Sequence, residues 1–178
     1  MTICWGLENA QSIYEINKLH SSHNKQNFSC GSTYLDNYLK TQASQDIKKN
    51  VAVTYVITTI NSPEVIGYYS LSTISIDVSE LSGETVKKLP RYPMLPGILL
   101  ERLAVDSTQQ GKKIGGHLLI DALKRSLSIS DQIGINAIIV DAKDDKAAKF
   151  YHHYQFTEFP SNKLKLFLPI NTVKLLNL

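Results

Sequence analysis

A turn rich in glycine and lysine joins a strand-like segment to a helix-like segment in the second half of the chain. The residues that set the pattern are Leu103, Ala104, Val105, Gln110, Gly111, Lys112, Lys113, Gly115 and Gly116. Free backbone N–H groups and the positive end of the dipole make a helix start an anion site. Glycine allows close approach of a phosphate to the backbone, and lysine adds positive charge. The pattern fits a phosphate-binding turn, with close packing of strand against helix as an equally weighted alternative.

A second segment, residues 147–156, places a phenol and two histidines on one short helix-like stretch. Tyrosine is a residue type that acts as a general acid, but the residues alone favour simple packing of Tyr151 beside Phe150. His152 and His153 lie about 100° and 200° further round a helix than Tyr151. We therefore expect both histidines to be exposed.

The flanking segments predict the elements that must position these residues. Apolar residues at helical spacing predict helices over 32–50, 114–129 and 144–154. Runs rich in β-branched residues predict strands over 51–60, 65–76, 98–105, 135–140, 156–159 and 164–168. Shorter helices are expected over 11–20 and 79–89. This order predicts a mixed α/β sandwich around one sheet, with the first two strands joined as a hairpin.

Composition limits the class of protein without identifying a reaction. A length of 178 residues predicts one domain over 1–178, and 43% hydrophobic against 20% charged residues excludes global disorder. A formal net charge of +3 is too small to identify a partner. Cys4 and Cys30 form no metal-ligand spacing, so we expect no metal. Without signal-like or membrane-spanning apolar runs, the expected location is cytoplasmic, with no membrane partner.

The glycine–lysine turn resembles motif A of the GNAT acetyltransferases, Q/R-x-x-G-x-G/A, which follows the fourth strand of that fold. Gln110 matches the first position and Gly115 the last, whereas Lys113 replaces the middle glycine. A lysine there is strained if the position requires a positive φ, or supplies a further phosphate contact.

Residues 147–156 are similar to motif B, A-x-x-F-Y-x-x-x-G-F, with Gln155 in place of the glycine. Segments upstream resemble the toxin GNATs of bacterial toxin–antitoxin modules, of the TacT and AtaT type: Phe28–Gly31, Leu35–Leu39, Thr54–Val56, Val65–Leu71 and Pro96–Val105. The resemblance extends over about residues 26–168, with the motifs in order.

The resemblance implies an α/β GNAT fold, with a mixed central sheet, a V-shaped splay between strands 4 and 5, and about four flanking helices. Acetyl-CoA would lie in that V. The main chain of Leu103, Ala104 and Val105 would pair with pantetheine, and the turn would hold the pyrophosphate through Gln110, Gly111, Lys112, Lys113, Gly115 and Gly116. Tyr151 would be the general acid that protonates the CoA thiolate. Glu101 is a candidate base, although water can take the proton of a weakly basic aminoacyl amine.

By the same resemblance, the chain would acetylate the α-amino group of aminoacyl-tRNA and so inhibit translation. Its partners would be a ribbon-helix-helix antitoxin and a second copy in a homodimer. A tRNA needs a basic surface, and the candidates are Lys87, Lys88, Arg91, Lys143, Lys146 and Lys149.

Two other readings stay open from the sequence. One is a GNAT that acetylates a protein lysine or a small amine such as a polyamine. The departures at Lys113 and Gln155 also leave room for a degenerate GNAT that binds partners without catalysis. The sequence does not specify which aminoacyl group would be modified.

Overall fold

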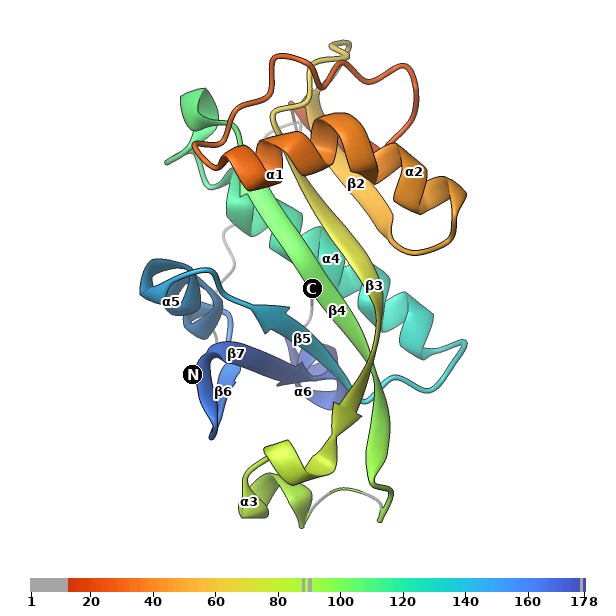
Figure 1. Cartoon of the computed structure of the whole chain (residues 1–178), viewed down its shortest axis with the longest axis vertical. Helices are drawn as coiled ribbons and strands as arrows, with labels where there is room; N and C mark the ends of the chain where they lie inside the picture. Colours follow the sequence, from red (N-terminus) through yellow and green to blue (C-terminus); the bar gives the residue numbers. More distant parts are fainter. Residues whose placement is uncertain (1–12, 88, 90, 177) are drawn as a thin grey trace.

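One mixed sheet organises the part of the chain that the computed structural model describes, residues 13–87, 89, 91–176 and 178. Its strand order is β1-β2-β3-β4-β5-β7-β6 (Figure 1). The strands are β1 Tyr14–Lys18, β2 Val53–Thr59, β3 Gly67–Asp77, β4 Met94–Val105, β5 Ala137–Asp141, β6 Thr157–Phe159 and β7 Asn162–Pro169. Within this sheet β4 and β5 pair in parallel, and the other neighbours are antiparallel. The predicted mixed sheet and the hairpin of β2 and β3 are confirmed.

The sheet opens between β4 and β5. The two strands pair only from Gly97 opposite Ala137 to Leu100 opposite Val140. Beyond Leu100, β4 continues alone on that side as far as Val105, and Figure 1 shows the two strands diverging. This is the predicted V-shaped splay.

The helix predicted over 32–50 covers one face of the sheet. It consists of α1 Thr33–Asn37, a π-helical turn Tyr38–Gln42 and α2 Ala43–Lys48. Tyr38, Leu39 and Ala43 are buried against the neighbouring strands, where Tyr68 and Ala104 belong to the same apolar cluster. The helix therefore lies over β2, β3 and the open part of β4.

α4, Ile114–Ser130, packs on the opposite face, behind the sheet in Figure 1. Of the residues whose spacing predicted this helix, Leu118, Leu119, Ala122 and Leu123 are buried, and Leu127 is half-buried. Gly67 on β3 lets the helix approach closely, because a Cβ there would lie 3.0 Å from Leu118 Cδ1 and 3.1 Å from the Ala104 carbonyl oxygen.

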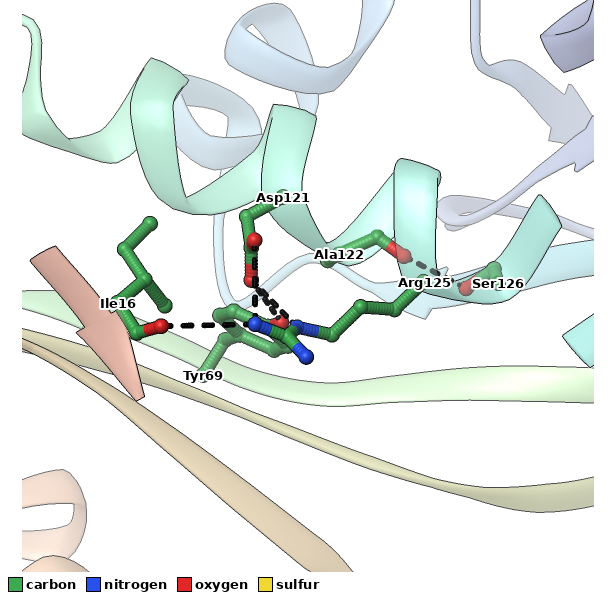
Figure 2. Close-up of polar contacts among 6 residues, drawn as sticks. All are labelled: Ile16, Tyr69, Asp121, Ala122, Arg125 and Ser126. Carbon is green, nitrogen blue, oxygen red and sulfur yellow. Dashed lines mark hydrogen bonds and ion pairs between the residues drawn. The ribbon is translucent and has the colours of Figure 1, made fainter. Parts of the chain in front are cut away.

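A polar network joins α4 to the first three strands. The Tyr69 hydroxyl donates to Asp121 Oδ2 at 2.5 Å, and Arg125 Nε donates to the same oxygen at 2.8 Å (Figure 2). Arg125 also reaches the Ile16 carbonyl at 3.5 Å and stacks over the Tyr55 ring at 4.0 Å. One arginine thus connects α4 with β1 and β2.

The remaining helices are short. α3 is Gly83–Val86, α5 is Asp145–His153 and α6 is Ile170–Leu175. Asp144 is the N-cap of α5, accepting from the Ala147 amide at 2.7 Å, which confirms the predicted start of that helix. No helix in the described residues is both long and apolar enough to span a bilayer.

Two helix predictions are wrong. In place of the helix over 11–20, residues 14–18 form β1, because Tyr14 and Ile16 alternate with exposed residues and pair with β2. Residues 11 and 12 lie outside the described part. The helix over 79–89 is broken into a 3₁₀ turn, Val78–Glu80, and α3, because Leu81 is extended and buried and Ser82 caps a new helix. The C-terminal helix α6 was not expected.

Candidate active site

The open part of β4 has one bonded edge and one edge facing the splay. Leu103, Ala104 and Val105 pair with β3, opposite Tyr69, Tyr68 and Gly67. On their other side β5 has already diverged. Backbone groups alternate between the two edges of a strand, and the Asp106 amide donates to the Ile66 carbonyl beside β3, so the backbone groups of Leu103 and Val105 lie at the open edge. An extended ligand with amides can pair with that edge.

The turn after β4 leads into a helix start without a capping side chain. Asp106 closes the turn by accepting from the Thr108 amide at 3.0 Å, and Gly111 has φ +81°. Lys113, the N-cap of α4, makes no side-chain cap bond, and the first turn of α4 has no acidic residue. Among the described residues, the amides of 111–115 donate to no acceptor. Lys112 and Lys113 are exposed beside this set of amides, which suits an anion.

Both departures from the GNAT glycine pattern have left-handed backbones. Lys113 has φ +62° and Gln155 has φ +68°. A side chain in this region costs about 1 kcal/mol, which glycine avoids. At both positions the backbone therefore has a conformation that the glycine of the motif would adopt without this cost.

The Gln110 side chain points at main-chain carbonyls. Its Nε2 donates to the Val105 carbonyl at 3.1 Å and to the Cys30 carbonyl at 3.2 Å. Gln110 therefore joins the end of β4 to the segment that precedes α1.

The two glycines at the start of α4 are where the two predicted motifs meet. A Cβ on Gly115 would lie 3.8 Å from the Phe150 ring and from Val105 Cγ2. A Cβ on Gly116 would lie 2.4 Å from the Tyr154 hydroxyl, so any side chain there displaces Tyr154. The fold thus brings α5 against the glycine–lysine turn at the start of α4.

Tyr151 is buried on α5, with 8% of its surface exposed. Its ring packs edge-on against Phe150 and Phe156, at centroid distances of 5.2 and 5.5 Å. Among the described residues its hydroxyl makes no hydrogen bond, and burial raises the pKa of the phenol. The phenol therefore keeps its proton at neutral pH, as a general acid must.

The histidines beside Tyr151 are exposed, as predicted. His152 contacts the Phe156 carbonyl oxygen and Glu158 Oε1, both at 3.0 Å. His153 packs edge-on against Tyr154. His152 therefore secures the turn between α5 and β6.

The predicted basic residues do not form one patch. Lys87 pairs with Glu84 at 2.7 Å beside α3, and Arg91 is exposed before β4. Lys112 and Lys113 lie beyond the other end of β4, whose 12 residues span roughly 36 Å. Lys143, Lys146 and Lys149 are exposed on or next to α5. Lys88 lies outside the described residues.

A polar cluster on β4, facing α1, was not anticipated as a group. Leu71 pairs with Leu100 and Ser70 with Arg102, so Glu101 is the extra residue of a β-bulge. Its carboxylate accepts from Ser72 Oγ at 2.6 Å and from the Arg102 guanidinium. Arg102 also donates to the Tyr34 hydroxyl at 3.1 Å. Two charged neighbours in an otherwise apolar strand were the available sequence signal for this bulge.

Among the described residues, no group of three or more His, Cys, Asp or Glu side chains is arranged to hold a metal ion.

The geometry is that of a GNAT-type site, with an open β4 edge, an uncapped glycine–lysine helix start and a buried tyrosine on the next helix. No family model matches the chain. Curated relatives do. A tRNA-acetylating toxin of Mycobacterium tuberculosis is 37% identical over 141 residues, covering 79% of this chain and 82% of the relative. A probable toxin TacT of Sinorhizobium fredii is 31% identical over 159 residues, covering 85% and 88%.

Solved structures match as well. AtaT complexed with acetyl-methionyl-tRNAfMet superposes with a TM-score of 0.85 and 29% identity, covering 93% of this chain and 99% of AtaT. An AtaT mutant bound to acetyl-CoA and to the C-terminus of the antitoxin AtaR gives a TM-score of 0.77 and 25% identity, covering 92% and 97%. The chain belongs to the TacT and AtaT family of GNAT acetyltransferase toxins.

Proposed function

We propose that this protein transfers the acetyl group of acetyl-CoA to the α-amino group of aminoacyl-tRNA and thereby blocks translation. The observation that carries the proposal is the meeting of three features at the β4–β5 splay: the open edge of β4, the uncapped start of α4 and the helix that holds Tyr151. The similar AtaT binds acetyl-CoA and an acetylated aminoacyl-tRNA, which supports both substrates.

The residues present fit acetyl-CoA. At the open edge of β4, the Leu103 backbone groups and the Val105 amide are available to the pantetheine amides, whereas the Val105 carbonyl accepts from Gln110. The free amides of residues 111–115 and the Lys113 ammonium suit the pyrophosphate. Gly111 adopts the positive φ that the turn requires, and Gly115 and Gly116 leave room for Phe150 and Tyr154 against the start of α4. These contacts leave the thioester at the splay.

In the reaction the amine nitrogen attacks the thioester carbonyl carbon, so that a C–N bond forms and the C–S bond breaks. The leaving thiolate takes the proton of the Tyr151 hydroxyl, which solvent later restores. The raised pKa of Tyr151 keeps that proton available at neutral pH. Water takes the proton that the attacking amine loses, because an aminoacyl ester amine is only weakly basic.

The tRNA would be held by the acetyltransferase domain itself, which we take as one domain over 1–178. The exposed lysines at α5 lie next to the helix of Tyr151 and are the main candidates for phosphate contacts, whereas Lys87 and Arg91 would meet a more distant part of the tRNA. In the cytoplasm the protein would form a homodimer. It would also bind a ribbon-helix-helix antitoxin, and the complex of AtaT with the antitoxin AtaR supports an antitoxin partner.

The test is an acceptor panel with labelled acetyl-CoA: charged tRNA, the same tRNA after deacylation, a lysine peptide and spermidine. We expect label on charged tRNA alone, released with the amino acid by mild base. A Lys143→Gln/Lys146→Gln/Lys149→Gln variant should lower transfer and its salt dependence without changing CoA affinity. Label on spermidine or on the peptide in preference to charged tRNA would overturn the proposal in favour of a small-amine or protein acetyltransferase.

A further inference from the structure

The segment Phe28–Gly31, which precedes α1, is tied to the turn that follows β4. The Ser107 amide donates to the Ser29 carbonyl at 2.8 Å, and the Ser29 amide donates to Asp106 Oδ2 at 2.9 Å. Gln110 Nε2 adds the bond to the Cys30 carbonyl at 3.2 Å. Residues nearly eighty positions apart thus form one hydrogen-bonded unit.

The chemistry of the Gln110 amide fixes its orientation. Both of its partners, the carbonyls of Cys30 and Val105, are acceptors, so the NH₂ group must face them. The remaining polar atom of this side chain, Oε1, is itself an acceptor and has nothing to offer a pyrophosphate. In this arrangement the Gln110 side chain is committed to the protein.

Two carboxylates hold the same segment from opposite sides. Asp106 accepts from the Ser29 amide with Oδ2 and from the Thr108 amide with Oδ1. Burial opposes the charge of Asp106, yet these bonds outweigh it and lower the pKa of the carboxyl. Asp36 on α1 accepts from the Cys30 amide at 2.9 Å. The segment is therefore bonded both to the turn after β4 and to α1, so that a shift of the turn would also shift α1.

α1 in turn reaches the open part of β4. The Leu35 carbonyl accepts from the Tyr68 hydroxyl at 2.9 Å, and the Tyr34 hydroxyl accepts from Arg102 at 3.1 Å. Arg102 bonds to Glu101, the first residue of β4 after its pairing with β5 ends. A continuous set of contacts therefore runs from the proposed cofactor turn, through Cys30 and α1, to the face of β4 opposite α4.

We propose that Gln110 is a positioning residue. Through its bonds to Cys30 and Val105 it fixes the position of α1, which we place beside the amine that accepts the acetyl group, and it does not bind the cofactor phosphates. The part of this statement that concerns the acceptor rests on the function proposed above. On this proposal the turn after β4 serves both substrates. Its amides face the anion of the cofactor, and the Gln110 and Asp106 side chains hold the segment that positions α1 for the acceptor.

The test compares Gln110→Ala and Gln110→Met with Gln109→Ala as the matched control. Methionine keeps the length of the side chain and removes its donors. Among the described residues, the Gln109 side chain bonds only within the turn, accepting from Lys112 Nζ at 3.0 Å and donating to Thr108 Oγ1 at 3.5 Å. We expect amide hydrogen exchange over residues 28–37 to rise about tenfold in both Gln110 variants and to stay unchanged in the control. The dissociation constant of CoA should change less than about twofold, while KM for charged tRNA rises about tenfold with little change in kcat.

A rise of tenfold or more in the CoA dissociation constant, with exchange over 28–37 unchanged, would overturn the proposal and make Gln110 a phosphate ligand. Exchange and CoA binding are measured without an acceptor. If the wild-type protein failed to acetylate any tRNA, the proposed function would fall while these two measurements still decided the role of Gln110.

Discussion

Two arginines on opposite faces of the sheet have similar neighbours, but the buried polar groups around them differ in how completely they are hydrogen-bonded. We call a face saturated when its buried polar groups all have partners. Arg125 stacks on Tyr55 and pairs with Asp121 on the α4 face. Arg102 stacks on Tyr38 at 3.7 Å and pairs with Glu101 on the α1 face. A tyrosine hydroxyl completes each set.

The α4 face is the saturated one. In Figure 2 the Asp121 carboxylate accepts from both Tyr69 and Arg125, and Arg125 reaches the Ile16 carbonyl. Burial works against the charge of Arg125, but the bond to Asp121 outweighs it and raises the pKa of the guanidinium. This network therefore stabilises the packing of α4 on β1, β2 and β3.

On the α1 face, several buried polar atoms have no partner among the described residues. They are Tyr38 Oη, Thr54 Oγ1, Ser70 Oγ and Arg102 Nε. Thr54, Ser70 and Arg102 are aligned across β2, β3 and β4, where the sheet opens. Most buried polar groups in proteins have a hydrogen-bond partner, so these four atoms are exceptions, and all four lie on the α1 face. The two faces therefore differ in how completely their buried polar groups are bonded.

The largest expected effect is on stability at the saturated face. Asp121→Ala leaves Arg125 and the Tyr69 hydroxyl without their shared acceptor, and we expect a loss of about 2–3 kcal/mol in the free energy of unfolding. Urea denaturation followed by circular dichroism measures it. Ser70→Ala on the α1 face is the matched variant and should lose no more than about 0.5 kcal/mol, because the Ser70 hydroxyl has no partner among the described residues. Equal losses would erase the distinction between the two faces.

Alkaline pH should weaken the saturated face next. Burial, together with the bond to Asp121, raises the pKa of Tyr69. Since the raised pKa favours the protonated folded state, the contribution of Tyr69 to stability is complete below the unfolded value of about 10 and falls above it, by about 1.4 kcal/mol per pH unit. Unfolding measured from pH 8 to 11 checks the slope, and Tyr69→Phe should reduce it. An unchanged slope in that variant would contradict the assignment.

A smaller effect is expected on activity at the α1 face. The Glu101 carboxylate already accepts from Ser72 and Arg102, so Glu101→Gln should lower the rate of acetyl transfer less than about tenfold. Steady-state transfer to charged tRNA measures it. A loss of several orders of magnitude in a folded variant would make Glu101 the general base after all.

The smallest effect is expected where a polar atom has no partner. Ser70→Ala should change the free energy of unfolding by no more than about 0.5 kcal/mol, because the lost hydroxyl makes no bond within the described chain. Thr54→Val is the companion substitution. A loss above about 2 kcal/mol in either variant would show that the α1 face is as saturated as the α4 face.

Local patterns predicted much of the fold. The apolar spacing of Leu118, Leu119 and Ala122 indicated α4, and Asp144 marked the start of α5. For Lys113 the motif comparison left open a strained positive φ or a further phosphate contact, and the structure has the positive φ. These features depend on neighbours in sequence, which is why the sequence alone was enough.

Features that depend on distant partners were not predictable. Residues 14–18 form a strand because they pair with the edge of β2, and the short alternation of Tyr14 and Ile16 is too brief to distinguish a strand from a helix without that partner. Gln110 faces Cys30 only because the fold brings the segment before α1 to the end of β4. The stacking of Arg102 on Tyr38 likewise requires both elements in place.

The direct test of the account is single-turnover acetyl transfer to charged tRNA by the wild-type protein and by Tyr151→Phe, with the CoA dissociation constant measured for both. Removing a hydroxyl that makes no bond within the described residues leaves the ring packing against Phe150 and Phe156 unchanged. We predict a rate lower by a factor of about 100 or more, with CoA affinity within about twofold. A Tyr151→Phe protein that keeps more than about half of the wild-type rate would contradict a general-acid role for this phenol.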